Sequence, residues 1–238
     1  MMAVLGDWRH AGASIRGVVR LLAFGVGLSL AGCGDDADPT PNGTTSTVPE
    51  GAEIETLSPG AQPLPGESEC KVVIARKIPV ESANHLDECS SLEFAANPPS
   101  SGDHWPRWAA FRRYTVPVAR EMYVHNQEHG GVVLSYRCSG ACPSVVAMLE
   151  QVMDDYPDDV FCSMNIPVVR NRLLLTPDPK LPTTIAASAW GATYTATCLD
   201  PTSLAAFVAE VYGKGPELTC FDGVDVAESG GTLPECAD

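Results

Sequence analysis

The sequence predicts an α+β domain over residues 69–238, built as a two-layer sandwich of helices against a sheet. Three observations carry this prediction: the order of the apolar segments, two amphipathic helical stripes, and an even set of cysteines in the same region. The segments run strand, helix, three strands, helix, which is the element order of a thioredoxin-like core. Other two-layer α+β sandwiches share this order, and residues 70–124 would form an N-terminal extension packed on the core.

Four apolar segments are expected as strands. GGVVLSYR (130–137) has a continuous apolar core with β-branched residues, as a buried strand has, and VVRNRLLL (168–175) follows as the second strand. TTIAASAW (183–190) and TYTATCL (193–199) flank a Gly-Ala pair, which favours a hairpin. The proline-rich TPDPKLP that precedes the hairpin cannot be a central strand, so it is expected as a connection.

Two segments have the 3.6-residue period of amphipathic helices. The first begins at Pro143, which suits a first helical turn, and ends at Pro157. The second follows Asp200, a natural N-cap, and ends at Gly213. The apolar faces consist of Val145, Met148, Leu149, Val152, Met153 and Tyr156 in the first helix and of Leu204, Phe207, Val208, Val211 and Tyr212 in the second.

The first 32 residues have the composition of a signal peptide. Three arginines accompany the apolar run LLAFGVGLSL (21–30), which is too short for a permanent membrane helix. LAGC then resembles a bacterial lipobox, in which cleavage leaves Cys33 as the lipidated N-terminus; the alternative is an ordinary signal peptide in which Cys33 is incidental. We therefore expect an exported protein that is lipid-anchored in the bacterial cell envelope through Cys33, with Gly34 favouring the outer membrane.

Residues 33–68 are rich in Pro, Thr, Gly, Ser and acidic residues and show no apolar period. Such a composition buries too little apolar surface to offset chain entropy, so we expect a disordered tether. The residues after it have the size of a single domain.

The formal net charge of −15 argues against nucleic acid and anionic lipid headgroups as partners, because both attract basic surfaces.

Eight cysteines follow Cys33. An even number of cysteines in an exported domain indicates a disulfide framework, so we expect a disulfide-stapled fold. The sequence leaves the pairing open; neighbour pairs such as Cys70–Cys89 and Cys220–Cys236 are two of many possibilities.

All histidines beyond the signal peptide lie between residues 85 and 129. His125 and His129 are four residues apart, so they converge if their segment takes one helical turn, with Glu128 beside the second. His104 follows the rigid segment NPPSSGD, and His85 lies further upstream. Because imidazole is the commonest transition-metal ligand, the pattern predicts a copper or zinc site. Its ligands would be His104, His125 and His129, with His85 or Glu128 completing or supporting the shell.

His125, Glu128 and His129 also have the spacing of the inverted zinc-protease motif. That motif needs a long helix, whereas Gly130 and Gly131 end any helix here and the residues after them are typical of a strand. The sequence also contains neither a nucleophile elbow nor a glycine-rich phosphate loop. The pattern therefore identifies no catalytic residue, and we expect a metal-binding protein rather than an enzyme.

Four blocks in order, NPPSSGDHW, VHNQEHGGVVLSY, IAASAWG and GKGPE, resemble the bacterial family known as domain of unknown function 3105. The resemblance spans about His85 to Glu217. The sequence departs from the family pattern at Ser100, where threonine is usual, and at Gln127, where leucine is usual. The family implies a shared domain and no stated activity. The residues that the resemblance places at motif positions are His85, His104, His125, Glu128, His129 and Gly130.

Cys138 and Cys142 lie between an expected strand and an expected helix, in the segment YRCSGACP. This arrangement resembles the metal-binding loop of Sco-type copper chaperones, which implies a thiol redox or copper-delivery protein as an alternative. No histidine follows Cys142, unlike in those chaperones, and a plain disulfide is the other interpretation. A third hypothesis is a non-catalytic lipoprotein that binds another envelope component, with its histidines hydrogen-bonded inside a folded loop.

Overall fold

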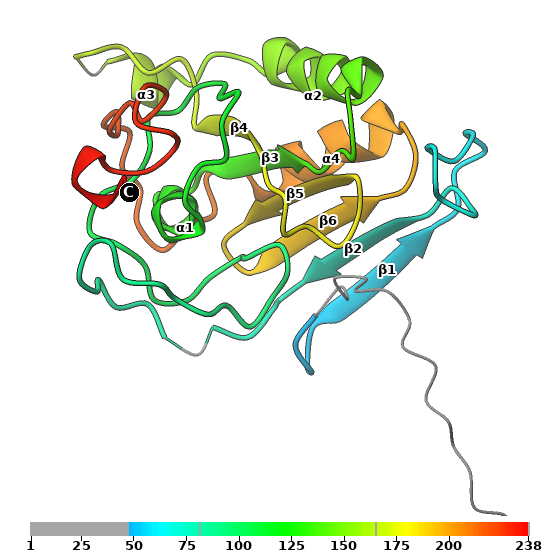
Figure 1. The fold of residues 1–238 in the computed structure, drawn as a ribbon, viewed down its shortest axis with the longest axis horizontal. Coiled ribbons are helices and arrows are strands. Elements are labelled where there is room, and N and C mark those ends of the chain that lie inside the picture. Colours follow the sequence, from blue (N-terminus) through cyan, green and yellow to red (C-terminus); the bar gives the residue numbers. More distant parts are fainter. Residues whose placement is uncertain (1–47, 81, 165, 238) are drawn as a thin grey trace, which may run out of the picture. The chain divides into compact units, whose positions relative to one another are not determined.

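The computed structural model describes residues 48–80, 82–164 and 166–237, which contain a six-stranded mixed sheet (Figure 1). The sheet order is β1-β2-β6-β5-β3-β4. Within the described ranges no helix is long and apolar enough to cross a membrane. The elements are β1 (Glu53–Leu57), β2 (Val72–Arg76), α1 (Arg120–Glu128), β3 (Val132–Tyr136), α2 (Pro143–Asp155), α3 (Val160–Ser163), β4 (Leu173–Pro177), β5 (Ile185–Ala189), β6 (Ala192–Ala196), α4 (Pro201–Val211) and the 3₁₀ turn η1 (Pro234–Cys236).

The segment from β3 to α4 has the predicted order of strand, helix, three strands and helix, with the short helix α3 inserted before β4. β3 and β4 are parallel and are connected through α2, because parallel neighbours need a long crossover. β5 and β6 form the predicted hairpin, and β5 also pairs antiparallel with β3. Gly191 in the hairpin turn has a φ of +72°, which glycine adopts without strain. The α+β class and the predicted element order are therefore confirmed.

Both faces of the sheet are covered, because successive residues of a strand point to opposite sides. Val132 and Leu134 of β3 lie in one core with the apolar faces of α2 and α4, as the periodicity predicted. Val133 lies in a second core with Met122 and Val124 of α1. The helix α1, which begins in the predicted N-terminal extension and ends four residues beyond it, therefore covers the face opposite α2 and α4 (Figure 1).

The predicted tether contains a strand, so its assignment to residues 33–68 is wrong at the C-terminal end. β1 lies in this range and pairs antiparallel with β2 along its whole length. Its side chains are mostly exposed, so the strand leaves no apolar pattern, and main-chain pairing and ion pairs such as Arg76–Glu55 (2.8 Å) hold it. The signal peptide, Cys33 and the rest of the predicted tether up to residue 47 lie outside the described residues.

Disulfides staple the domain, as predicted, and they include all eight cysteines of the described chain. The neighbour pairs Cys70–Cys89 and Cys220–Cys236 are wrong. Cys70 instead meets Cys198 because β2 lies beside β6, so sheet pairing and not sequence distance selects the partner. Bonds that close long loops restrict the unfolded chain most. The four bonds are Cys70–Cys198, Cys89–Cys236 and Cys162–Cys220, which join distant segments, and Cys138–Cys142, which closes a short loop.

Candidate metal centre

The centre is built on α1, a buried helix with an unusual share of polar residues. All residues from Met122 to Glu128 are buried. Buried polar groups need partners, and both side-chain amides of this helix find them in the protein. The Asn126 side-chain amide donates to the carbonyl oxygen of Ala109 at 2.7 Å, and the Gln127 amide donates to the hydroxyl of Ser188 at 2.7 Å. These bonds fix the rotation of α1 and so the direction of its other side chains.

The end of α1 places two histidines on one side of the helix. Gly130 takes a φ of +77°, which ends the helix, and its N–H donates to the carbonyl oxygen of Gln127 at 2.9 Å. His125 and His129 are one helical turn apart and therefore face the same side. Glu128 lies next to the second of them, so one turn presents two imidazoles and a carboxylate.

A backbone carbonyl orients the ring of His125. Its Nδ1 donates to the carbonyl oxygen of Trp105 at 2.7 Å, which leaves the lone pair of Nε2 available to a ligand. Burial lowers the pKa of His125 to about 3, although the bond to the Trp105 carbonyl acts in the opposite direction. His125 is therefore uncharged at neutral pH, which is the form of imidazole that binds metal ions.

The loop that follows the two prolines orients His104 in the same way. Its Nδ1 donates to the carbonyl oxygen of Gly102 at 2.8 Å, and its Nε2 lies 2.9 Å from Oε2 of Glu128. The backbone of His104 pairs with the segment around His85, which brings the second ring beside the first. Nε2 of His85 lies 3.4 Å from the same carboxylate oxygen, and the His85 side chain is 47% exposed.

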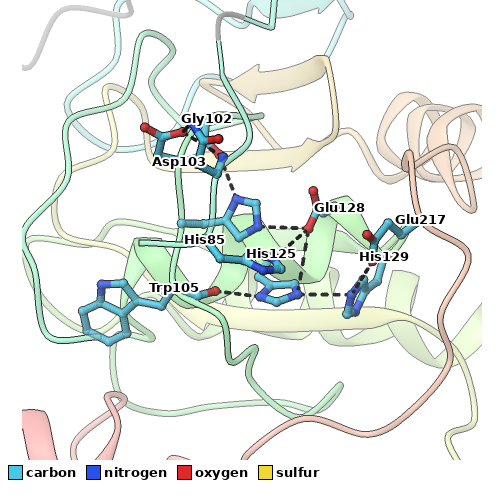
Figure 2. A network of polar contacts seen from close by, with 10 residues as sticks. His85, Gly102, Asp103, Trp105, His125, Glu128, His129 and Glu217 are labelled. Atoms are coloured by element: carbon cyan, nitrogen blue, oxygen red, sulfur yellow. Dashed lines mark hydrogen bonds and ion pairs between the residues drawn. The ribbon is translucent and has the colours of Figure 1, made fainter. Parts of the chain in front are cut away.

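Four ligand atoms converge at this point, one each from His85, His104, His125 and Glu128, and all lie within 4.8 Å of one another. Figure 2 shows His85, His125 and Glu128 of this group. The Nε2 atoms of His104 and His125 are acceptors in the neutral rings, because Nδ1 carries the proton in both. An ionised carboxylate is also only an acceptor. Acceptors packed this closely need a cation or a proton between them, and three nitrogens with one oxygen are a donor set that zinc and copper accept.

His129 lies beside this group of four and contacts Glu217, a residue that the sequence did not single out as a ligand. Nε2 of His129 is 3.2 Å from Nε2 of His125 and 3.3 Å from Oε2 of Glu217 (Figure 2). Burial lowers the pKa of His129 to about 4. The three predicted ligands therefore fall into two groups. His104 and His125 lie with His85 and Glu128, whereas His129 lies with Glu217. The one sequence signal for Glu217 was its place at the end of the block GKGPE.

Aromatic rings surround the imidazoles. The Trp108 ring lies 4.9 Å from that of His125 and 4.3 Å from that of His129, measured between centroids. The Trp190 ring lies 6.1 Å from that of His104. Such walls exclude water and lower the local dielectric, which strengthens the attraction between a bound cation and the carboxylate.

Two groups of cysteines do not offer thiolates to a metal. Cys162 and Cys220 lie near Asp159 but are joined to each other. Cys138 and Cys142 are also joined, at the N-terminus of α2, where they line a cavity of about 650 Å³. This pair follows β3, whereas all the histidines of the cluster precede that strand. Copper delivery through these sulfurs would first require reduction of their bond, because the thiolate is the metal ligand.

The histidine cluster lies in the part of the chain that a family model matches. A family model described as "Protein of unknown function (DUF3105)" matches residues 85–222, more than half of the chain. The chain belongs to the DUF3105 family. The matched DUF3105 region begins at His85 and includes Glu217, so the whole histidine cluster lies inside it. No curated protein and no solved structure matches the chain.

Proposed function

We propose that this DUF3105 protein binds a divalent transition-metal ion, zinc or copper, through His85, His104, His125 and Glu128. One observation carries the proposal. Nε2 of His104 lies 2.9 Å from Oε2 of Glu128 while its Nδ1 already donates to a carbonyl. With a neutral His104 ring, whose one proton is on Nδ1, two acceptors face each other here, and a metal ion that binds both removes their repulsion.

The donor set favours zinc(II) and copper(II) over other common ions. Imidazole nitrogen suits both, whereas magnesium and calcium prefer oxygen ligands. Copper(I) prefers sulfur ligands, and the cysteines of the described chain are all in disulfides. Four protein ligands form a closed site that holds an ion. The half-exposed ring of His85 offers that ion a route from solvent.

The test is the metal content of the His104→Gln/His125→Gln double variant. We expect the unmodified protein to retain zinc or copper after exposure to each ion and desalting, and the double variant to lose it, because two of four ligands are gone. Elemental analysis measures both proteins, and competition between the ions identifies the preferred one. Magnesium serves as the control ion, since the oxygen-poor donor set should not retain it.

Glutamine keeps an N–H that can donate to the carbonyl oxygen of Trp105 or Gly102, so the double variant should remain folded. Circular dichroism checks this. Equal metal content in a folded double variant and the unmodified protein would refute the proposal, and so would the absence of bound metal from both.

We also propose that the protein is exported and lipid-anchored through Cys33. The arginine-flanked apolar run and the LAGC segment support this, and so do four disulfides, which form and persist in oxidising compartments. We expect the unmodified protein in the membrane fraction and the Cys33→Ser variant outside it or unprocessed. Mass spectrometry of the mature N-terminus should detect a lipid on Cys33. An unlipidated N-terminus at another residue would contradict the anchor.

A further inference from the structure

We propose a second divalent-cation position beside the first, held by His129 and Glu217 and sharing Glu128 with the group of four. This inference rests on the proposed function, because it adds a second ion to the same centre. We call the position of His85, His104 and His125 the inner site and the position of His129 and Glu217 the outer site.

The two sites are distinct groups of ligand atoms with one residue in common. Ligand atoms of Glu128, His129 and Glu217 lie within 4.8 Å of one another, as do those of the inner site. Glu128 belongs to both groups, and a carboxylate has two oxygens, so it can bridge two cations. Two-metal sites in proteins hold their ions about 3.5–4 Å apart in this manner. Figure 2 shows the row of side chains from His85 to Glu217.

His129 is the residue that most requires a further ligand. The side chain is only 4% exposed, and its Nδ1 has no hydrogen-bond partner among the described residues. Its Nε2 lies 3.2 Å from Nε2 of His125, whose proton is on Nδ1. If an ion occupies the inner site, the His125 lone pair binds that ion and no longer accepts from His129. The His129 Nε2 then faces the carboxylates of Glu217 and Glu128, and a ring with its proton on Nδ1 can bind a second cation among them.

The loop after α4 is fastened to the end of α1, which delivers Glu217 to His129. The N–H of Gly213 donates to the carbonyl oxygen of Gly130 at 2.9 Å. The N–H of Glu217 donates to the carbonyl oxygen of Glu128 at 3.0 Å. Gly215 between them lies so close to α1 that an added Cβ would stand 2.2 Å from the Glu128 carbonyl oxygen. This close packing fixes the backbone of the loop beside α1, and from there the Glu217 side chain, 54% exposed, reaches His129.

The charges around the outer site favour a cation. Glu128 and Glu217 contribute two carboxylates to the shared centre. The guanidinium of Arg172 donates to the carbonyl oxygen of His129 at 2.9 Å, which brings positive charge close to the site. That guanidinium forms an ion pair with Asp159 at 3.1 Å, and the ion pair offsets much of its repulsion toward a metal ion.

The outer site should exchange its ion more readily than the inner site. It has three protein ligands, so at least one coordination position remains for water, as in sites that expose a metal to solvent. The inner site has four protein ligands and is closed. A brief treatment with a chelator should therefore remove the outer ion first.

The test is the zinc stoichiometry of the full protein and of its Glu217→Gln variant. Equilibrium dialysis with elemental analysis should find about two zinc ions per chain in the unmodified protein and about one in Glu217→Gln, since the outer site loses one of its three ligands. Glu228→Gln, a change at another exposed glutamate, is the matched control and should retain both ions. Electron paramagnetic resonance with copper(II) should show coupled ions in the unmodified protein and an isolated ion in Glu217→Gln.

The outcomes separate this inference from the proposed function. One ion in both the unmodified protein and Glu217→Gln would overturn the outer site and leave the inner site intact. Two ions in both would overturn the role of Glu217. No bound zinc or copper in any of the proteins would refute the proposed function and, with it, the second position.

Discussion

Glu128→Gln is expected to stabilise the metal-free protein and to weaken its stabilisation by metal. In the metal-free protein the glutamine amide can donate to Nε2 of His104, which now faces a carboxylate oxygen at 2.9 Å. A new buried hydrogen bond contributes about 1 kcal/mol. With metal, the variant loses the one anionic ligand of the inner site, and a neutral amide is a much weaker ligand.

The metal-dependent part of this effect is large. A ligand present at about 100 times its Kd stabilises the folded state by about 2.7 kcal/mol. For a domain of this size, that corresponds to a rise of about 5–10 °C in melting temperature. We expect this rise for the unmodified protein with zinc or copper, and a clearly smaller rise for Glu128→Gln, which keeps only the three imidazoles of the inner site. Thermal unfolding at neutral pH, with and without a chelator, measures both quantities.

Glu121→Gln is the matched control for this prediction. Glu121 lies on the same helix, and its carboxylate accepts from the backbone N–H of Leu92 at 3.2 Å, a bond that glutamine can keep. This variant should respond to metal as the unmodified protein does. If Glu128→Gln instead destabilised the metal-free protein, a proton would lie between His104 and Glu128, and the pair would be a structural ion pair rather than two ligands.

The fold could be predicted where the residues that pack in the core also form a regular apolar pattern along the sequence. The apolar face of α2 packs on the sheet, so its 3.6-residue period is visible in the sequence. β1 is an exposed strand held by main-chain pairing with β2, and main-chain pairing leaves no trace in side-chain composition. The partner of Cys70 depends on β2 lying beside β6, which is a property of the whole sheet.

The sequence indicated which residue types form the candidate site, but not which of these residues lie together. Imidazole chemistry belongs to the side chain, so the gathering of histidines in one part of the sequence was informative. The pairing of His85 with His104 is a single long-range bridge with no local signature. Glu217 reaches His129 only because the loop after α4 docks on the end of α1. Contacts of this kind arise from the fold and cannot be derived from spacing along the chain.

Gly215→Ala is expected to destabilise the metal-free protein by about 3 kcal/mol, near the upper end for overpacking of a buried contact. The new Cβ would stand 2.2 Å from the carbonyl oxygen of Glu128 and 2.3 Å from the backbone nitrogen of Gly130. These are backbone atoms at the end of a helix, so they cannot turn aside as a flexible side chain can. The loop must move away, and the bond from the N–H of Glu217 to α1 is lost.

Urea unfolding of the metal-free protein measures this effect, and Gly60→Ala is its control. A Cβ at Gly60 meets nothing within 4 Å, so the free energy of unfolding should change by less than about 0.5 kcal/mol. Because the displaced loop carries Glu217, Gly215→Ala should also release the outer ion while the inner ion remains. A variant as stable as the unmodified protein would mean that the loop is not docked on α1. Glu217 would then have no fixed place beside His129, and the shared centre would reduce to the inner site alone.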